Sequence, residues 1–235
     1  MAKKSLIIAH RGFSGSYPEN TLLAFRKARD LGVDGFELDI QLTRDKQVIV
    51  FHDETLERTT TGRGLVVSHT LAELQKLDAG RGEKIPQLAE ILKVFRHGPQ
   101  LYLELKYHHD SGYKPLVDTA LHILRKQKMK YPPVFCSFNW PALAYLRTCD
   151  NNIGIAVLHL SQPLTTVVRF AREVQASLLF TNLEEISPSK VKSAHKNNLG
   201  VFAWTVNSQE SAAICRQAGA DGLISNYPDL VRTIT

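Results

Sequence analysis

Short apolar runs alternate with longer segments of helical periodicity along most of the chain. The apolar runs have the length of β-strands, whereas the segments between them place apolar residues three and four positions apart. Strands are predicted at residues 6–9, 36–40, 48–51, 101–105, 134–138, 153–158, 178–180, 201–206 and 223–225, and helices at 21–31, 87–95, 113–128, 163–174, 187–197 and 208–217. This alternation predicts an α/β protein with a parallel sheet, of which the (β/α)8 TIM barrel is the economical closed form.

One connection does not fit a regular barrel, because nine predicted strands compete for eight places. The link between Gln41 and Val48 is shorter than the roughly dozen residues that a parallel crossover needs, so we predict a hairpin there. A second irregular region, residues 54–82, contains threonine, glycine and arginine clusters and a short amphipathic piece at 71–77. About thirty residues cannot build an independent core. We therefore predict a small inserted cap within a single domain that spans residues 1–235.

Composition indicates in which cellular environment the protein works and which classes of ligand suit its charge. The chain contains no apolar run near the ~18 to 20 residues of a membrane span, so no membrane span is predicted. The three cysteines lie far apart and form no CxxC pair, which argues against a disulfide framework or a zinc knuckle and favours a cytoplasmic location. A formal net charge of +6 suits phosphates, nucleic acid or anionic lipid surfaces, but charge alone does not choose among them.

Ionisable side chains lie at or just after the ends of four predicted strands. In barrels of this type the carboxyl ends of the strands form the catalytic face, so such residues are candidates for function. They are His10 and Arg11, Glu37 and Asp39, His52 and Asp53, and Glu104 and Lys106. Taken singly, an acidic strand face or a histidine is more often structural. Their coincidence on several strands favours a shared site.

Glu37, Asp39 and Glu104 are predicted to share one cation. Residues two apart in a strand project from the same face, so Glu37 and Asp39 point together while their apolar neighbours point the other way. Three carboxylates that converge at a barrel mouth would repel strongly without a positive charge between them. Hard oxygen ligands without sulfur select Mg²⁺ or Ca²⁺ over zinc or copper.

His10 and His52 then remain as the pair that can exchange protons near neutral pH. Hydrolysis of a phosphodiester requires one group to accept a proton from the attacking oxygen and another to donate a proton to the leaving alkoxide. Arg11 and Lys106 are suited to hold the phosphate oxygens. The residues indicate a metal-dependent phosphodiesterase, with a metal-dependent aldolase or enolising enzyme as an alternative on the same barrel.

A set of short motifs resembles the glycerophosphodiester phosphodiesterase family and occurs in order over nearly the whole chain. The motifs are AHRG at 9–12, PENT at 18–21, ELD at 37–39, TRD at 43–45, HD at 52–53, RTT at 58–60, ELK at 104–106 and WTVN at 204–207. The resemblance implies a phospholipase-C-like TIM barrel that hydrolyses glycerophosphodiesters, such as glycerophosphocholine or glycerophosphoethanolamine, to sn-glycerol 3-phosphate and an alcohol. The implied partner is this small molecule rather than nucleic acid, and the cap would cover the glycerol.

The resemblance also implies a role for each matching residue. It implies His10 and His52 as the acid/base pair, Arg11 as a phosphate ligand, Glu37, Asp39 and Glu104 as ligands of the divalent cation, Lys106 as the active-site lysine and Trp204 as an aromatic that lines the substrate pocket. For Trp204, core packing in the eighth strand is the alternative.

Two features fall outside the family pattern. Family members often read T-D-x-P near the C-terminus, whereas this chain reads SNYP at 225–228. Asn226 keeps the size of an aspartate but loses its charge, so we predict an effect on local hydrogen bonding rather than on activity. His108 and His109 follow the ELK motif closely and match no motif, and no role is assigned to them.

Two alternative functions remain open on the sequence. A lysophospholipase D acting on single-chain lipids would need an apolar groove, for which Phe13, Tyr17, Phe138 and Trp204 are the candidate lining. The second alternative is a catalytically silent phosphate-binding barrel, against which the presence of both histidines and all three acids argues.

The sequence does not choose between Mg²⁺ and Ca²⁺, between the two histidines as acid and base, or between direct water attack and a cyclic phosphate. Nor does it indicate an oligomeric state.

Overall fold

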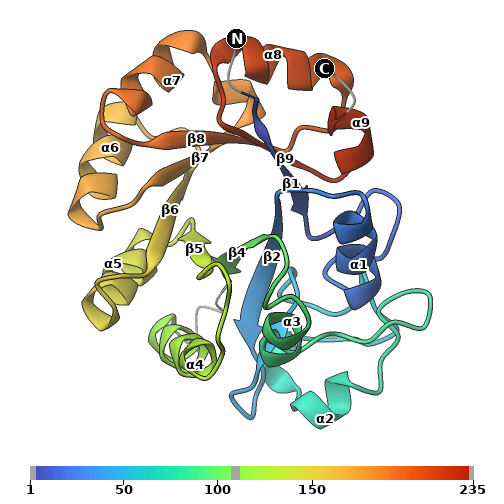
Figure 1. The fold of residues 1–235 in the computed structure, drawn as a ribbon. Coiled ribbons are helices and arrows are strands. Elements are labelled where there is room, and N and C mark those ends of the chain that lie inside the picture. Colours follow the sequence, from blue (N-terminus) through green and yellow to red (C-terminus); the bar gives the residue numbers. More distant parts are fainter. Residues whose placement is uncertain (1–3, 107–111, 233–235) are drawn as a thin grey trace.

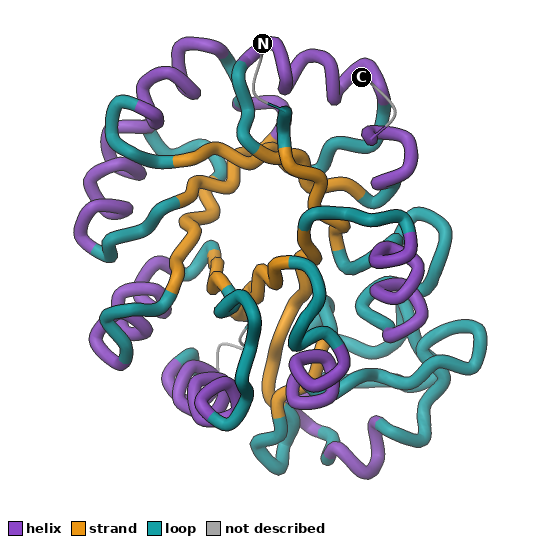
Figure 2. Tube along the Cα trace, viewed as in Figure 1, coloured by secondary structure: helices purple, strands orange, loops and turns teal. Residues whose placement is uncertain are grey.

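A parallel β-barrel enclosed by helices forms the centre of the molecule (Figures 1 and 2). The computed structural model describes residues 4–106 and 112–232. The strands are β1 (Leu6–His10), β2 (Gly35–Leu42), β3 (Val48–Val50), β4 (Gln100–Leu105), β5 (Val134–Ser137), β6 (Gly154–His159), β7 (Leu178–Asn182), β8 (Gly200–Trp204) and β9 (Gly222–Ser225). Parallel pairing runs from β2 through β4 to β9, and β1 closes the ring by pairing with both β9 and β2. The predicted TIM barrel is confirmed.

The strand β3 is the extra one and lies outside the parallel ring. It pairs antiparallel with β2, so that Ile40 lies opposite Val50 and Leu42 opposite Val48. The intervening turn is closed by a hydrogen bond from the amide of Thr43 to the carbonyl of Gln47 at 3.0 Å. The predicted hairpin is therefore confirmed, and it explains why nine strands make an eight-stranded barrel.

Helices cover the outside of the barrel (Figure 2). They are α1 (Leu22–Asp30), α3 (Leu88–Val94), α4 (Lys114–Arg125), α5 (Trp140–Cys149), α6 (Leu164–Glu173), α7 (Pro188–His195), α8 (Gln209–Ala218) and α9 (Pro228–Arg232), with 3₁₀ turns at Val66–Ser68 and Leu183–Glu185 and the four-residue α2 (Leu71–Leu74). Within the described ranges, no helix combines the length and the apolar character needed to cross a membrane.

Helix α5 is not predicted by the apolar periodicity, and a buried charge explains why. Arg147 lies on its core-facing side, where its guanidinium donates hydrogen bonds to backbone carbonyls that include those of Val174 and Ile153, each at 2.8 Å. This arginine interrupts an otherwise apolar stripe. The helix begins after Asn139, whose side chain accepts a hydrogen bond from the amide of Ala142 at 2.8 Å, as an N-cap residue does.

The alternation of side chains along the strands divides the core into two layers. On the outer face, Phe36 of β2 packs against Phe25 of α1 and against Phe95, with ring centroids 5.5 and 5.1 Å apart. The inner face of the barrel is filled by a second apolar cluster: Ile8, Tyr102, Cys136, Ala156, Leu158, Phe180, Phe202 and Ile224. Because the period of two continues along each strand, the inward positions beyond this apolar floor are those that carry the candidate polar residues.

Residues 54–82 pack beside the hairpin around a small apolar cluster, to which Ile49, Phe51 and Ile85 also contribute. Its members are Ile49, Phe51, Leu56, Val66, Leu74, Ala79 and Ile85. Arg81 also ties this segment to the loop before α1, because its Nη2 donates to the carbonyl of Ser16 at 2.9 Å. The segment thus lies against the side of the barrel next to α1 (Figure 1).

Candidate active site

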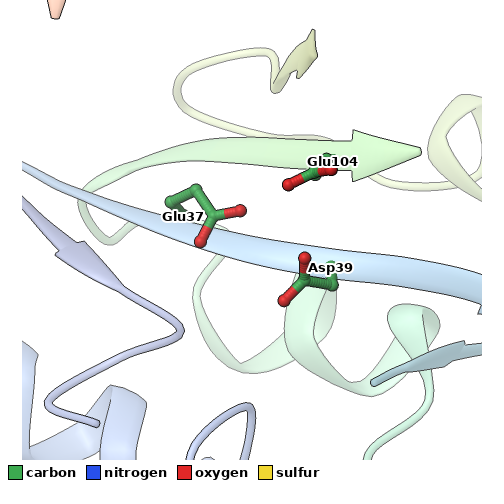
Figure 3. Close-up of side chains that lie close together, drawn as sticks. All are labelled: Glu37, Asp39 and Glu104. Atoms are coloured by element: carbon green, nitrogen blue, oxygen red, sulfur yellow. The ribbon is translucent and has the colours of Figure 1, made fainter. Parts of the chain in front are cut away.

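Three buried carboxylates converge on the inner face of β2 and β4 (Figure 3). Glu37 and Asp39 lie two residues apart on β2, and parallel pairing places Asp39 beside Glu104 of β4. One oxygen atom from each side chain lies within 4.8 Å of the other two. The structure therefore brings together the three acids that the sequence singles out.

The electrostatics of the acidic cluster are unfavourable without a cation. Burial raises the pKa of Glu37 well above its usual range, and the nearby Asp39 and Glu104 raise it further. Burial also raises the pKa of Glu104 to about 7, although Lys106 opposes this shift. Burial acts on Asp39 in the same direction, but Lys106 and Arg11 outweigh it, so the pKa of Asp39 is lowered. Burial and mutual repulsion therefore disfavour the state in which all three carboxylates are ionised.

Asp39 leaves one acceptor open within this cluster. Its Oδ2 accepts a hydrogen bond from Asn20 Nδ2 at 2.8 Å, whereas its Oδ1 is buried and accepts none from the described residues. Lys106 Nζ is 3.6 Å from Oδ1, beyond normal hydrogen-bond distance. A buried acceptor without a donor is costly, and a hard divalent cation satisfies carboxylate oxygens of this kind. The residues present therefore fit Mg²⁺ or Ca²⁺.

Two side-chain cations flank the carboxylates. Lys106 Nζ lies 2.8 Å from Glu104 Oε1, and Arg11 Nε lies 3.2 Å from Asp39 Oδ2. Their side chains are 23% and 16% exposed, so both remain accessible to a ligand. Both can therefore bind an anion that lies next to the acidic cluster.

The sequence HRG turns the chain sharply at the end of β1. Arg11 has a left-handed backbone, with φ of 57°, and its amide donates to the carbonyl of Glu37 at 2.8 Å. Gly12 follows with φ of 79°, and a Cβ atom there would lie 2.7 Å from the backbone of Ala24 in α1. Glycine at this position lets the backbone approach α1 closely while the arginine side chain turns toward the carboxylates.

His10 is held by an amide rather than by a carboxylate. Its Nδ1 lies 2.6 Å from Asn226 Oδ1, and its Nε2 lies 3.7 Å from Glu37 Oε2. Because the amide oxygen only accepts, Nδ1 carries the proton and Nε2 presents its lone pair to the site. Burial, reinforced by the charge of Arg11, lowers the pKa of His10 to about 4. The imidazole of His10 is thus neutral at pH 7.

Asn226 is itself fixed from two sides. Its backbone amide donates to Asn207 Oδ1 at 2.9 Å, and Ser14 Oγ donates to its side-chain oxygen at 3.0 Å. The predicted effect of Asn226 on local hydrogen bonding is confirmed, but its partner is a candidate catalytic histidine. The expectation that the effect stays apart from activity no longer follows. Only the barrel closure brings these residues together, since Asn226 and His10 are 216 positions apart.

His52 faces the same site from beyond β3. Its Nδ1 lies 2.6 Å from Asp53 Oδ1. The backbone here is fixed by Gln41, whose Nε2 donates to the carbonyls of Phe51 and Asp53, each at 2.8 Å. Burial lowers the pKa of His52, partly offset by the charge of Asp39. The two candidate histidines therefore differ in their Nδ1 partner, which is a neutral amide for His10 and a carboxylate for His52.

The PENT motif supplies two partners to the site. Asn20 adopts φ of 58° and holds Asp39 through its Nδ2 at 2.8 Å. Glu19 Oε1 accepts a hydrogen bond from Arg11 Nη1 at 3.0 Å. A signal for these contacts exists in the sequence, because polar residues with turn character precede α1, but the pairing partners are not encoded locally.

A cavity of about 150 Å³ joins these groups. One side is polar and the other is apolar. The polar side is formed by His10, Arg11, Glu37, His52, Glu104 and Lys106, and the opposite side by Phe138, Leu158, Phe180, Trp204, Thr205 and Ile224. Both candidate histidines, both candidate phosphate ligands and two of the three acids thus border one space.

The aromatic candidates divide into two groups. Trp204 lines the cavity and packs edge-to-face on Phe138, with ring centroids 5.5 Å apart. Phe13 and Tyr17 belong instead to the outer core, where they pack on each other with centroids 5.4 Å apart, so their assignment to the pocket lining is wrong. The amide of Phe13 donates to the carbonyl of Ala24, which holds this residue next to α1. His108 and His109 lie outside the described residues.

Comparison with known proteins identifies the family that this chain resembles. Residues 10–230 match the glycerophosphoryl diester phosphodiesterase family. A glycerophosphodiester phosphodiesterase of Caldanaerobacter subterraneus is 35% identical over 240 residues, which cover 96% of each chain. A glycerophosphodiester phosphodiesterase of Bacillus subtilis is 30% identical over 97% of this chain and 86% of its own.

Solved structures agree with the sequence relatives. An Oleispira antarctica phosphodiesterase, solved in complex with its product sn-glycerol 3-phosphate, superposes with a TM-score of 0.92 at 30% identity and covers 97% of this chain and 95% of its own. The chain therefore belongs to the glycerophosphoryl diester phosphodiesterase family and is a phosphoric diester hydrolase.

Proposed function

We propose that this enzyme hydrolyses glycerophosphodiesters such as glycerophosphocholine and glycerophosphoethanolamine to sn-glycerol 3-phosphate and the free alcohol, and that it requires Mg²⁺ or Ca²⁺. The observation that carries the proposal is that two imidazoles, two cations and two carboxylates of the acidic cluster all border one cavity of about 150 Å³. The product complex of the Oleispira antarctica relative supports a substrate of this class. In this proposal Glu37, Asp39 and Glu104 hold the divalent cation.

The remaining residues of the site divide the chemistry among them. A bound divalent cation supplies charge neutralisation to the phosphate oxygens. Arg11 and Lys106 bind the same oxygens and orient the phosphorus between the two imidazoles. Trp204 and Phe138 cover the opposite side of the cavity and exclude water from it. Proton transfer is then left to His10 and His52.

The partners of the two histidines support different roles. His10 is paired with the neutral Asn226 and presents the lone pair of Nε2, which suits a base that accepts a proton from the attacking oxygen. His52 is paired with Asp53, whose negative charge stabilises an imidazolium. In this proposal His52 reacts as the imidazolium, in which Nδ1–H is held by Asp53 and Nε2–H gives its proton to the leaving alkoxide. The bond between phosphorus and that oxygen breaks as the proton arrives, and His52 is left neutral.

We also propose a domain organisation, a location and a partner for the enzyme. We propose a single domain over residues 1–235, in which residues 54–82 form a cap at the side of the glycerol. The three cysteines are free, which suits the reducing cytoplasm. The proposed partner is the small-molecule substrate, and nothing in the site calls for nucleic acid.

With glycerophosphocholine and Mg²⁺, the enzyme is expected to release choline and sn-glycerol 3-phosphate in equal amounts. Choline release is measured with an oxidase-coupled assay, and glycerol phosphate with its dehydrogenase. Formation of phosphocholine and glycerol instead would place the cleavage on the other side of the phosphorus. A lack of any phosphodiester hydrolysis with either Mg²⁺ or Ca²⁺ would contradict the proposed function.

A lysophospholipase D activity has one observation in its favour. The apolar lining of the cavity includes Phe138, which is 39% exposed. The volume argues the other way, because about 150 Å³ is below the ~300 Å³ at which pockets for larger ligands begin. Choline release from lysophosphatidylcholine is therefore expected to be slower than release from glycerophosphocholine under the same conditions.

Removing the amide of Asn226 is expected to impair His10. Asn226→Leu leaves Nδ1–H of His10 buried without an acceptor, which costs about 1–3 kcal/mol and releases the imidazole from its orientation, so kcat should fall roughly tenfold or more. Asn226→Asp keeps an acceptor and should retain activity. Its added negative charge favours the imidazolium, so the pKa of His10 rises and the acidic limb of the profile of kcat/KM against pH moves to higher pH. An unshifted limb in Asn226→Asp, together with full activity in Asn226→Leu, would show that this contact is not used.

A further inference from the structure

Arg58, from the RTT motif in residues 54–82, binds two carboxylates at the edge of the site. Its Nη1 and Nη2 donate to the two oxygens of Glu19 at 2.8 and 2.7 Å. Its Nε and Nη2 donate to the two oxygens of Asp53 at 2.5 and 2.8 Å. One guanidinium thus forms two forked pairs, which is the arrangement that fixes carboxylate orientation best.

Each of these carboxylates in turn holds a residue of the proposed chemistry. Glu19 accepts a hydrogen bond from Arg11 Nη1 at 3.0 Å, and Asp53 Oδ1 lies 2.6 Å from Nδ1 of His52. Arg58 is therefore the shared neighbour of two chains of contacts, which lead to two different residues on the polar side of the cavity. The sequence motifs give roles to Arg11 and His52, but they give none to Arg58, which connects them.

We propose that Arg58 is a positioning residue, which fixes the positions of His52 and Arg11 relative to each other through Asp53 and Glu19. The proposal rests on the proposed function, in which His52 is the acid and Arg11 binds phosphate. It gives residues 54–82 a part in catalysis beyond covering the substrate. Arg58 itself touches neither histidine.

The backbone and side chain of the HD motif are fixed by different residues. Gln41 holds the carbonyls of Phe51 and Asp53, so the course of the chain does not depend on Arg58. The side chain of Asp53, in contrast, is 22% exposed, and two hydrogen bonds from Arg58 orient its carboxylate. Loss of Arg58 should therefore free the Asp53 side chain, and with it the ring of His52, while the fold persists.

Arg58 also lowers the pKa values of both carboxylates. The hydrogen bonds from Arg58 are the main reason that the pKa of Asp53 is lowered to about 2. Burial would raise the pKa of Glu19, but hydrogen bonds and charges of Arg58 and Arg11 reverse this and lower it. Both groups are thus ionised at neutral pH. Without the guanidinium, two negative charges would face each other beside the site.

A lysine cannot replace this arrangement. Its ammonium is a single point of charge and cannot form two forked pairs at once, whereas the guanidinium is planar and rigid. Arg58 is 49% exposed, and exposed ion pairs contribute little to stability. The expected signature is therefore a loss of alignment with little loss of stability, which separates a positioning role from a structural one.

The test compares Arg58→Ala and Arg58→Lys with Arg63→Ala, which removes an exposed arginine of the same segment. With glycerophosphocholine and saturating Mg²⁺, kcat is expected to fall about 10- to 100-fold in Arg58→Ala, since a misplacement of about 1 Å can have an effect of this size. Arg58→Lys should lie between Arg58→Ala and the wild type. Arg63→Ala should match the wild type, and thermal unfolding should show all variants folded.

The second measurement does not use activity. In ¹⁵N-histidine-labelled protein, two-bond ¹H–¹⁵N spectra report the tautomer of His52, which is assigned by the loss of its signals in His52→Gln. The wild type should show a protonated Nδ1, and Arg58→Ala should show a mixture of tautomers. An unchanged His52 signal in Arg58→Ala overturns the proposal, and so does a changed signal with kcat within twofold of the wild type. Absence of hydrolysis by the wild type would instead refute the proposed function, and the spectra would still decide what Arg58 holds.

Discussion

His52→Ala and His10→Ala are each expected to lower kcat by a factor of about 10² to 10⁴, the usual range for a positioned acid or base. Each imidazole borders the cavity and has a partner that fixes its Nδ1, so its loss removes an oriented proton-transfer group. The matched control is His122→Ala on α4, an exposed histidine that should leave kcat unchanged. The measurement is steady-state hydrolysis of glycerophosphocholine at saturating Mg²⁺.

The choice of leaving group separates the two histidines. Choline is a poor leaving group and needs a proton, whereas p-nitrophenolate leaves without one. If His52 is the acid, the loss caused by His52→Ala should shrink strongly with a p-nitrophenyl diester, while the loss caused by His10→Ala should persist. The reverse pattern would exchange the two roles. Near wild-type rates with glycerophosphocholine in either variant would remove that histidine from the mechanism.

Glu37→Gln is expected to weaken the dependence on the divalent cation more than it weakens the fold. The substitution removes one of three carboxylates, so the Mg²⁺ concentration that gives half-maximal kcat should rise roughly tenfold or more. The metal-free protein should keep its melting temperature, because Glu37 is buried beside two other acids and its pKa is already raised. The measurements are a Mg²⁺ titration of activity and thermal unfolding with and without the cation. A large fall in melting temperature with an unchanged titration would indicate a structural role.

The same site predicts how cation binding depends on pH. The pKa of Glu104 is raised to about 7, and that of Glu37 is raised as well, so both carboxyls bind protons more readily than usual. Protons therefore compete with the cation as the pH falls through about 7, and the half-saturating Mg²⁺ concentration should be higher at pH 6 than at pH 8. Treatment with a chelator should abolish activity, and titration back with Mg²⁺ and with Ca²⁺ shows which ion the site prefers.

The barrel and its acidic cluster could be predicted because both follow from short-range periodicity. A period of two along β2 places Glu37 and Asp39 on one face, and parallel pairing with β4 brings Glu104 to them. The short link before Val48 excluded a parallel crossover and predicted the hairpin. These inferences need only the local pattern and the rule that the carboxyl ends of barrel strands share one face.

The contacts that orient the site could not be predicted, because they join distant parts of the chain. Asn226 meets His10 only after the barrel closes, and Arg58 meets Glu19 only after residues 54–82 fold back against the loop before α1. Sequence gives the polar residues but not their partners. The assignment of Phe13 to the pocket fails for a related reason, since the turn at Arg11 is followed by a backbone contact with α1, where the amide of Phe13 donates to the carbonyl of Ala24.

The most direct test is a crystal structure of the enzyme with Mn²⁺ and sn-glycerol 3-phosphate. Mn²⁺ replaces Mg²⁺ at oxygen sites and is located by its anomalous scattering. We expect one ion bound by oxygens of Glu37, Asp39 and Glu104, with the phosphate between the imidazoles of His10 and His52. An ion bound elsewhere, or a phosphate out of reach of both imidazoles, would contradict the account.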